Sequence, residues 1–528
     1  MGSMEEPPAV KSEKVFNKWD YPMFIVLTSL SFVSTLYFVW QWISFQDWKY
    51  YPVTFSVLSL LLVTKLSNTQ ARWFSLPFMR RPKPLIALRH WKLGVVTTVV
   101  PSAESLEMLE ETIKALIALD YPHDSWILDE GDDTRIKVLC TKYGAHHFSR
   151  KAMSRYQTAD GLFQSGSKHG NYNAWLHEIG FERYEIITAF DPDHVPNAAF
   201  ITNVLGYFED PKIGYVQAAQ CYYNQKASFI ARGAAEETYE YYSCTQMAAY
   251  AIGHPIVVGC HNTHRVKALK QVGGFAPHDA DDLLITLFYR ARGWQGVYVP
   301  QILARGLVPV DWHGYLTQQL RWARSVIDVR FRINSILGRD LPFKESVLGY
   351  IHGLLYLQHS ITTFLSILLL SFMLATGIAP RVISFSMLPK LGALVFALQL
   401  CAFFRQRFYL DWHSEAGLHW RAYLLRYAKW PYTLLALLDV FLRRRSPYAL
   451  TRKVGHKSQR ALLLWPHLAV ATLIGTTWAI GMVYGRMVNP VLHILAGLIV
   501  LGSTALVLTE QCVFPDPYDR ALIPFKER

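Results

Sequence analysis

The sequence of residues 184–194 is Tyr-Glu-Ile-Ile-Thr-Ala-Phe-Asp-Pro-Asp-His, an apolar run of strand length that ends on two carboxylates. Elsewhere, apolar residues at helical spacing, as at Leu106–Leu119, alternate with further strand-like runs. Those runs are Gly94–Val100, Ser125–Leu128 and Lys212–Gln217. Such alternation predicts a doubly wound α/β sheet, whose ligand site lies at the carboxyl ends of its strands.

Acidic side chains directly follow two of the predicted strands. Asp191 and Asp193 form a D-x-D pair, and a hard cation such as Mg²⁺ or Mn²⁺ takes oxygen ligands of this kind while keeping positions for phosphate. Asp129 and Glu130 follow Ser125–Leu128, where Asp129 could accept hydrogen bonds from a base or a ribose. The plainer alternatives are a solvated turn for the D-x-D pair and a helix N-cap cluster for Asp129.

Two later motifs also carry reactive or binding groups. Asp281 and Asp282 precede an apolar helical pattern, so they cap a helix or, if an acceptor hydroxyl reaches Asp282, provide a general base. The string Gln318-Gln-Leu-Arg-Trp322 pairs an anion clamp, Arg321, with a stacking platform, Trp322. Its alternative is an anchor at a membrane interface.

The composition narrows the class of protein. Of the 528 residues, 51% are hydrophobic and 18% are charged, which excludes disordered and fibrous chains. The net charge of +13 is concentrated beside apolar runs, a pattern typical of membrane proteins, and no basic, aromatic-interleaved face suggests nucleic acid. The six cysteines have no C-x-x-C or metal-ligand spacing, so the sequence predicts neither a disulfide framework nor a zinc site.

Six apolar stretches have about the length of a membrane span: Met23–Trp42, Tyr51–Leu66, Tyr350–Ala375, Val382–Phe404, Ala461–Tyr484 and Val491–Leu508. An even number on each side of the long gap places both termini and residues 74–344 on one side of the membrane. The Lys/Arg bias marks that side as cytosolic. Phe408–Leu442 is amphipathic and basic, so we expect it in the interface plane, with a seventh span from Trp430 as the alternative.

In this order, and framed by membrane spans, the four motifs resemble those of the processive family 2 glycosyltransferases. These enzymes are the membrane synthases of cellulose, hyaluronan, chitin, curdlan and related β-glycans. Further strings agree over about Val95 to Lys453. Val100–Glu104 resembles the family's V-P-S-Y-N-E, Lys168–Asn173 resembles K-A-G-N-x-N, and Tyr448–Lys453 resembles F-x-V-T-x-K, the gating loop of the cellulose synthases.

The resemblance implies a role for each matching residue. The implied contacts to the nucleotide sugar come from Pro101, Glu104, Asp129, Glu130, Lys168, Asp191, Gln318 and Arg321. The implied metal ligands are Asp193 and Asp191, and the catalytic pair is Asp282 with its neighbour Asp281. The implied acceptor contacts are Trp322, Gly259, Cys260 and His261, and the gating loop contributes Tyr448, Thr451, Arg452 and Lys453.

Two departures bear on the product. The family's T-E-D is Ala280-Asp281-Asp282 here. The base, Asp282, is kept, and the neighbouring glutamate is replaced by the shorter Asp281. Where cellulose synthases have F-C-G-S, this chain has Val258-Gly-Cys-His261, whose polar groups would reach the acceptor sugar and argue against a strict cellulose assignment. No PilZ signature follows the last span.

The expected organisation is a tail with two transmembrane helices (1–70), a cytosolic GT-A-type domain with interface helices (71–345), two transmembrane helices (346–407), an amphipathic helix and gating loop (408–460), and two transmembrane helices with a short tail (461–528). The resemblance implies a multi-pass protein of the plasma (inner) membrane that elongates a β-linked polysaccharide from a UDP-sugar and translocates it. Its expected partners are the donor, the growing polysaccharide and membrane lipids. The alternatives are a non-processive transferase acting on a lipid or glycolipid and, from a different class, a transporter.

Overall fold

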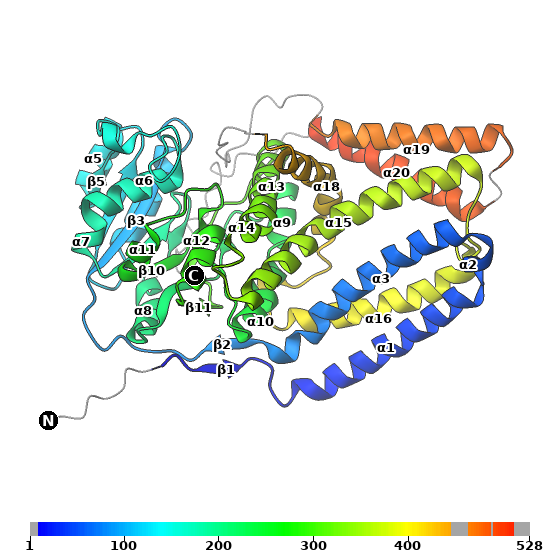
Figure 1. Cartoon of the computed structure of the whole chain (residues 1–528), viewed down its shortest axis with the longest axis horizontal. Helices are drawn as coiled ribbons and strands as arrows, with labels where there is room; N and C mark the ends of the chain where they lie inside the picture. Colours follow the sequence, from blue (N-terminus) through cyan, green and yellow to red (C-terminus); the bar gives the residue numbers. More distant parts are fainter. Residues whose placement is uncertain (1–8, 445–462, 487–488, 512–528) are drawn as a thin grey trace.

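The computed structural model describes residues 9–444, 463–486 and 489–511. It consists of an α/β domain at one end and a bundle of long helices at the other, with a layer of crossing helices between them (Figure 1). The expected fold class, an α/β domain inserted between membrane helices, is confirmed.

The α/β domain is built on a seven-stranded sheet with the order β11-β8-β10-β6-β3-β4-β5. All pairs in it are parallel except those made by β10, which runs antiparallel to both neighbours. The strands are β3 (Leu93–Val99), β4 (Asp124–Asp129), β5 (His146–Phe148), β6 (Ile186–Phe190), β8 (Ile213–Ala218), β10 (Asn262–Arg265) and β11 (Gln295–Val299). The four strands that the sequence predicts are β3, β4, β6 and β8.

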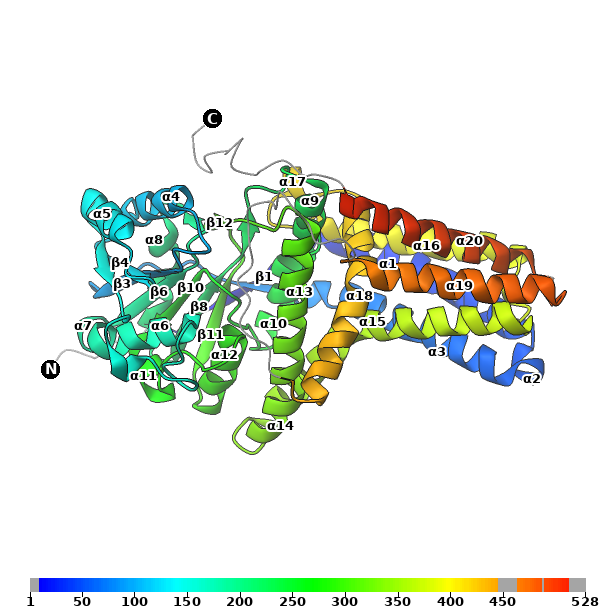
Figure 2. The same cartoon turned by 90° about the horizontal axis from the view of Figure 1, so that it is seen from above.

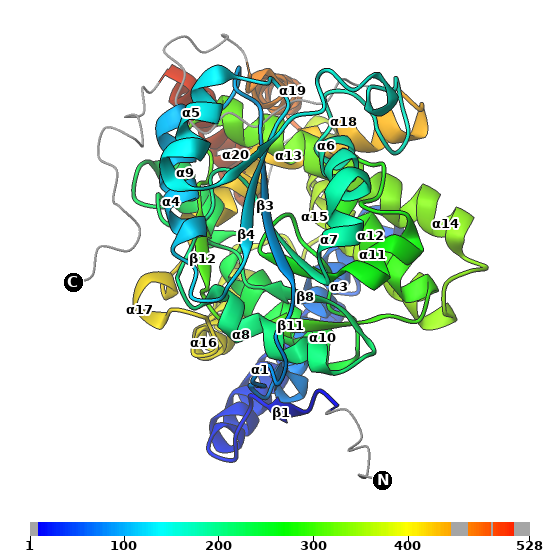
Figure 3. The same ribbon diagram turned by 90° about the vertical axis from the view of Figure 1, so that its left-hand side faces the viewer.

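Helices cover both faces of this sheet because its strands are apolar on both sides. Val95 and Ile127 pack against the helices of one face, while their neighbours Val96 and Leu128 pack against the other. The first face carries α4 (Leu106–Ile117), α5 (Thr134–Tyr143) and α8 (Phe200–Leu205); the second carries α6 (Lys168–Trp175), α11 (Val266–Val272) and α12 (Asp281–Ala291). Figure 3 shows α4 and α5 on one side of β3 and β4, with α6 and α12 on the other.

Two small sheets complete the domain. One joins β7 (Val195–Pro196), β12 (Ala304–Gly306) and β9 (Cys221–Tyr222), and the other joins β1 (Ser12–Lys14) to β2 (Arg80–Pro82). The first lies beside the end of β6, because β7 begins two residues after Asp193.

The crossing helices connect the domain to the bundle. They are α9 (Phe229–Glu236), α10 (Gln246–Ala251), α13 (Trp312–Ile327) and α18 (Trp420–Phe441). Figure 2 shows α13 and α18 running side by side across the direction of the long helices. The amphipathic segment predicted at Phe408–Leu442 therefore contains α18, which packs on α13 and α9, and it also contains the short helix α17 (Trp412–Glu415).

In the described parts of the chain, five helices are long and apolar enough to cross a membrane. They are α1 (Asp20–Ser44), α15 (Phe343–Thr376), the helical segment Phe385–Gln406 that includes α16 (Leu388–Gln406), α19 (Trp465–Val483) and α20 (Pro490–Leu508). The stretch Tyr51–Leu66, expected as a sixth span, lies in α3 (Pro52–Phe74), which does not qualify. Its second half carries Lys65, Asn68, Gln70 and Arg72, and this half lowers its mean hydropathy.

Candidate active site

The carboxyl ends of β4 and β6 carry the predicted acidic groups, as the parallel sheet requires. Asp129 ends β4 and is fully buried, where it accepts hydrogen bonds from the amides of Gly131 (2.8 Å) and Asp133 (2.5 Å). His147 lies 3.1 Å from the same carboxylate. Asp129 thus shapes the turn after β4, and its contact to a nucleotide stays a prediction.

Glu130 and Arg150 form an ion pair that orders the segment leading to α6. Arg150, which is fully buried, donates from Nε and Nη2 to the two oxygens of Glu130 at 2.9 and 2.8 Å. It also donates to the carbonyl oxygens of Tyr156, Phe163 and Gln164. Arg150 was not predicted as a site residue, because the residues around it in the sequence do not indicate that it binds Glu130, twenty positions earlier.

Lys168, at the start of α6, reaches the end of β6. Its Nζ lies 2.6 Å from Oδ1 of Asp191 and 3.2 Å from the carbonyl oxygen of Gly259. Burial, the largest single effect, would raise the pKa of Asp191. The charge and hydrogen bond of Lys168, together with His194, outweigh it and hold that pKa below its usual range. Lys168, Asp191 and Gly259, which are predicted from three separate strings, are therefore in direct contact.

Asp191, Asp193 and His194 could hold a metal ion, because one ligating atom from each lies within 4.8 Å of the others. Asp193 is almost fully buried, and His194 Nδ1 lies 3.2 Å from its Oδ1. Two carboxylates at a strand end supply the oxygen donors that Mg²⁺ and Mn²⁺ prefer. The residues present therefore fit the predicted divalent cation.

Asp281 and Asp282 begin α12 close to the same site. Asp282 Oδ2 accepts a hydrogen bond of 2.5 Å from the amide of Gly259, so the base candidate is anchored beside the Lys168 contact. Burial raises the pKa of Asp281 to about 7; Lys168 opposes this rise, whereas the charges of Asp282 and Asp191 add to it.

Cys260 and His261 lie behind this surface. Cys260 is 1% exposed and His261 is 0% exposed, and the His261 ring packs edge-on against the ring of His194 with centroids 4.9 Å apart. Their burial separates them from Gly259, whose backbone faces Lys168 and Asp282. Direct contact of Cys260 and His261 with an acceptor sugar stays a prediction.

The Gln318–Trp322 string lies on α13, as the helical reading required. Gln318 is buried, whereas Trp322 is 36% exposed and so can offer part of its ring surface to a ligand. Pro101 and Glu104 lie in the loop after β3, where the carboxylate of Glu104 accepts the amide of Val100 at 2.8 Å. The gating-loop residues Tyr448, Thr451, Arg452 and Lys453 lie outside the described residues.

A partly buried ion pair between α18 and Glu237, the residue after α9, also bonds two side chains of α13. Lys429 of α18 donates to Glu237 at 3.0 Å and to Oε1 of Gln319 at 2.9 Å, next to Gln318. The Tyr315 hydroxyl donates to the same Glu237 carboxylate at 2.7 Å. Lys429 and Glu237 could not be paired from the sequence, because they are 192 residues apart.

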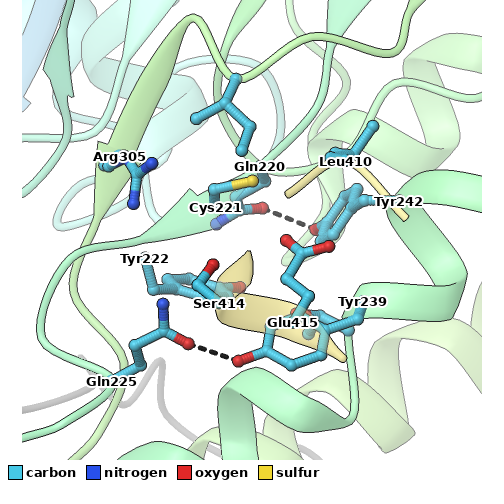
Figure 4. Close-up of a pocket in the computed structure, with 12 residues that line it drawn as sticks. Gln220, Cys221, Tyr222, Gln225, Tyr239, Tyr242, Arg305, Leu410, Ser414 and Glu415 are labelled. Atoms are coloured by element: carbon cyan, nitrogen blue, oxygen red, sulfur yellow. Dashed lines mark hydrogen bonds between the residues drawn. The ribbon is translucent and has the colours of Figure 1, made fainter. Parts of the chain in front are cut away.

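A small polar pocket lies beside the site, between β9, the segment after α9, and α17 (Figure 4). Its volume is about 10 Å³, room for about one water molecule. Figure 4 shows the Glu415 carboxyl group among Cys221, Tyr239 and Tyr242. Burial raises the pKa of Glu415 to about 7. Gln220 links this pocket to the site, because it accepts from Tyr242 at 2.7 Å and lies 3.2 Å from His194.

Residues 94–325 match the family described as "Glycosyltransferase like family 2". Cellulose synthase 2 of Novacetimonas hansenii is 27% identical over 342 residues, which is 61% of this chain and 20% of that protein. The cellulose synthase catalytic subunit of Xanthomonas axonopodis pv. citri is 24% identical over 313 residues, 58% of this chain and 40% of that protein.

Among solved structures, the mannosyltransferase PcManGT of Pyrobaculum calidifontis, in complex with GDP-Man and Mn²⁺, is 13% identical with a TM-score of 0.48. The match covers 75% of this chain and 99% of that one.

Proposed function

We propose that this chain, whose residues 94–325 match the family described as "Glycosyltransferase like family 2", is an inverting, processive membrane hexosyltransferase with a catalytic domain of the GT-A type. It would polymerise sugar from a UDP-sugar, with UDP-glucose favoured, into a β-linked polysaccharide and translocate the product across the membrane. The observation that carries this proposal is the meeting of Lys168, Asp191 and the Asp282–Gly259 contact in one site. Similarity to cellulose synthases supports the choice of donor and product.

The donor half of the site is the acidic end of β6. Asp191 and Asp193 would hold Mg²⁺ or Mn²⁺, which when bound neutralises negative charge on the departing nucleoside diphosphate. Arg321 would add a second positive charge near that leaving group. Pro101, Glu104, Asp129, Glu130 and Gln318 would line the rest of the nucleotide-sugar site.

The acceptor half lies between α12 and α13. Asp282 would remove the proton of the acceptor hydroxyl, and its bond to the Gly259 amide would fix the direction of that carboxylate. Trp322 would stack on the terminal sugar ring and keep it in line for attack. A single displacement of this kind inverts the configuration at the anomeric carbon.

The membrane helices on both sides of the domain would provide the exit path for the product. Basic residues flanking these helices support a multi-pass inner-membrane protein whose catalytic domain faces the cytosol. A non-processive transferase with a lipid or glycolipid acceptor would use the same donor half, but it gives no role to the exposed ring of Trp322.

The experiment that tests the proposal is a screen of radiolabelled UDP-sugars with the purified full-length protein in lipid nanodiscs and no added lipid acceptor. We expect incorporation into a β-linked product, from UDP-glucose first and UDP-N-acetylglucosamine second. Digestion with linkage-specific glycosidases would then identify the linkage. Transfer from no UDP-sugar at all would contradict the proposal.

A further inference from the structure

Three buried side chains with soft or borderline ligating atoms meet beneath the acidic end of β6. They are His194, Cys260 and His261, and one ligating atom from each lies within 4.8 Å of the others. Each is at most 1% exposed. Their separation in the sequence and the lack of a C-x-x-C pattern explain why spacing alone predicted no zinc site.

An unusual backbone brings Cys260 and His261 to the same point. Side chains of adjacent residues in a strand point to opposite faces. Here His261 has φ of 59°, in the left-handed region that residues other than glycine seldom adopt, just before β10 begins at Asn262. This turn places the thiol and the imidazole in one cluster.

The hydrogen bonds of the two histidines leave the same nitrogen available on each ring. His261 Nδ1 lies 3.0 Å from the carbonyl oxygen of Ala219, so that nitrogen carries the proton and donates. His194 Nδ1 likewise lies 3.2 Å from the carboxylate of Asp193. In both rings Nε2 then carries the free lone pair. A histidine that ligates a metal usually donates its other ring N–H to a carbonyl or carboxylate oxygen, as Nδ1 does here.

His261 Nε2 has no hydrogen-bond partner among the described residues, although the side chain is fully buried. His264, three residues further on, is equally buried, but its ring nitrogens lie 2.9 Å from the Tyr289 hydroxyl and 2.8 Å from Oδ1 of Asn262. Both ring nitrogens of His264 therefore have partners, whereas His261 has one only at Nδ1 within the part of the chain that the structure describes.

We propose that His194, Cys260 and His261 bind one Zn²⁺ ion. This site shares His194 with the Asp191/Asp193 group but takes its other donors, a thiolate and a second imidazole, from Cys260 and His261. One thiolate and two imidazoles suit Zn²⁺, whereas the oxygen donors at the end of β6 suit Mg²⁺ or Mn²⁺. Binding releases the Cys260 thiol proton to solvent and replaces the contact between Gln220 and His194 Nε2. This inference does not depend on the proposed transferase activity.

The test is the metal content of the full-length protein after exposure to Zn²⁺ and removal of loosely bound ions. We expect one zinc per chain in the wild type and none in Cys260→Ser or His261→Asn. Asn tolerates the left-handed backbone at position 261, so this variant keeps the local fold. Cys140→Ser, which changes a buried cysteine outside the cluster, is the matched control and should keep its zinc.

Two further measurements test whether the zinc is bound by the Cys260 cluster and not by the oxygen donors after β6. Asp191→Asn should retain zinc, because Asp191 belongs only to the oxygen-donor group. Replacement of zinc by Co²⁺ should give a thiolate-to-metal charge-transfer band that Cys260→Ser abolishes. Zinc in folded Cys260→Ser equal to the wild type, or a wild type without zinc, would overturn the proposal, as would loss of zinc in Cys140→Ser.

Discussion

The ion pair between Lys168 and Asp191 connects several predicted residues of the site. The ammonium group of Lys168 holds Asp191 ionised and also binds the carbonyl oxygen of Gly259, whose amide anchors Asp282. Gly259 thus joins the proposed donor half of the site to Asp282, the proposed base. We therefore expect a substitution of Asp191 or Asp193, which follow β6, to lower turnover more than it lowers the stability of the fold.

We predict that Asp193→Asn abolishes sugar transfer, by about 100-fold or more, because the amide is a poor ligand for a hard cation. The protein should still extract and migrate as a single species in size-exclusion chromatography. Transfer by the wild type should stop on chelation with EDTA and return with Mg²⁺ or Mn²⁺. Full activity in excess EDTA would contradict the metal assignment.

We predict that Trp322→Ala no longer synthesises polymer but still binds the UDP-sugar donor. The indole ring, 36% exposed on α13, could contribute on the order of 1–3 kcal/mol by covering a sugar ring. UDP-sugar affinity, measured by calorimetry, should stay within about twofold because the contacts at Asp191 and Asp193 are unchanged. An equal loss of both properties would show that Trp322 serves the fold instead.

Glu415→Gln tests the buried carboxyl group beside Gln220. Its pKa is about 7 in the folded protein because of burial, against about 4.3 in an unfolded chain. Between these values the folded state holds a proton that the unfolded state has lost, so wild-type stability falls as pH rises from about 4 to about 7. The full difference is on the order of 3 kcal/mol.

The glutamine variant lacks this titration. We expect its midpoint of thermal unfolding to equal that of the wild type near pH 4.5 and to exceed it at pH 8. Parallel curves for the two proteins across this range would contradict the assignment of a neutral Glu415.

At the scale of single residues, the sequence predicts the acidic side chains that we propose for the chemistry, but it does not predict the residues that support them. Asp191, Asp193 and Asp282 are recognisable because each stands where a strand ends or a helix begins. Arg150 carries no such local sign. The pairing of Cys260 with His194 depends on a left-handed backbone at His261 that no propensity of histidine predicts.

At the scale of elements, α4 and the four predicted strands, β3, β4, β6 and β8, agree with prediction because apolar periodicity follows burial directly. Strands β5 and β11 were not predicted. The antiparallel strand β10 was missed because its sequence, Asn-Thr-His-Arg, reads as polar. Its side chains are nevertheless largely buried, since Thr263 bonds Thr188 and His264 bonds Tyr289. The contact between α13 and α18 could not be predicted either, because it depends on how two helices far apart in the sequence pack together.

Lys429→Met tests that contact between helices. Removal of the ammonium leaves Glu237 with less compensation in a largely buried setting, and we expect a loss of about 2–3 kcal/mol, below the cost of breaking a fully buried pair. The midpoint of thermal unfolding in detergent should fall accordingly. Lys270→Ala, which breaks an exposed pair with Glu182, is the control and should change stability by less than about 1 kcal/mol.

At the scale of the whole molecule, the α/β domain is bounded on both sides by helices that are long and apolar enough to cross a membrane. Among the described residues five helices qualify, while α3, expected as a span, lies beside α1 and is tied to it by Trp42–Ser59 and Trp73–Thr28 hydrogen bonds. The sequence predicts a span in α3 because the first half of this helix is apolar. The sequence does not show whether the polar second half packs within a helical bundle.

The central claim is processive polymerisation, and the size of the product made from UDP-glucose tests it most directly. The purified wild-type protein in nanodiscs, given UDP-[¹⁴C]glucose and Mg²⁺ without any lipid acceptor, should produce label that elutes as long polymer in size-exclusion chromatography and is released by β-glucanase. Label found only as a mono- or disaccharide on lipid would contradict the processive account and favour the glycolipid transferase.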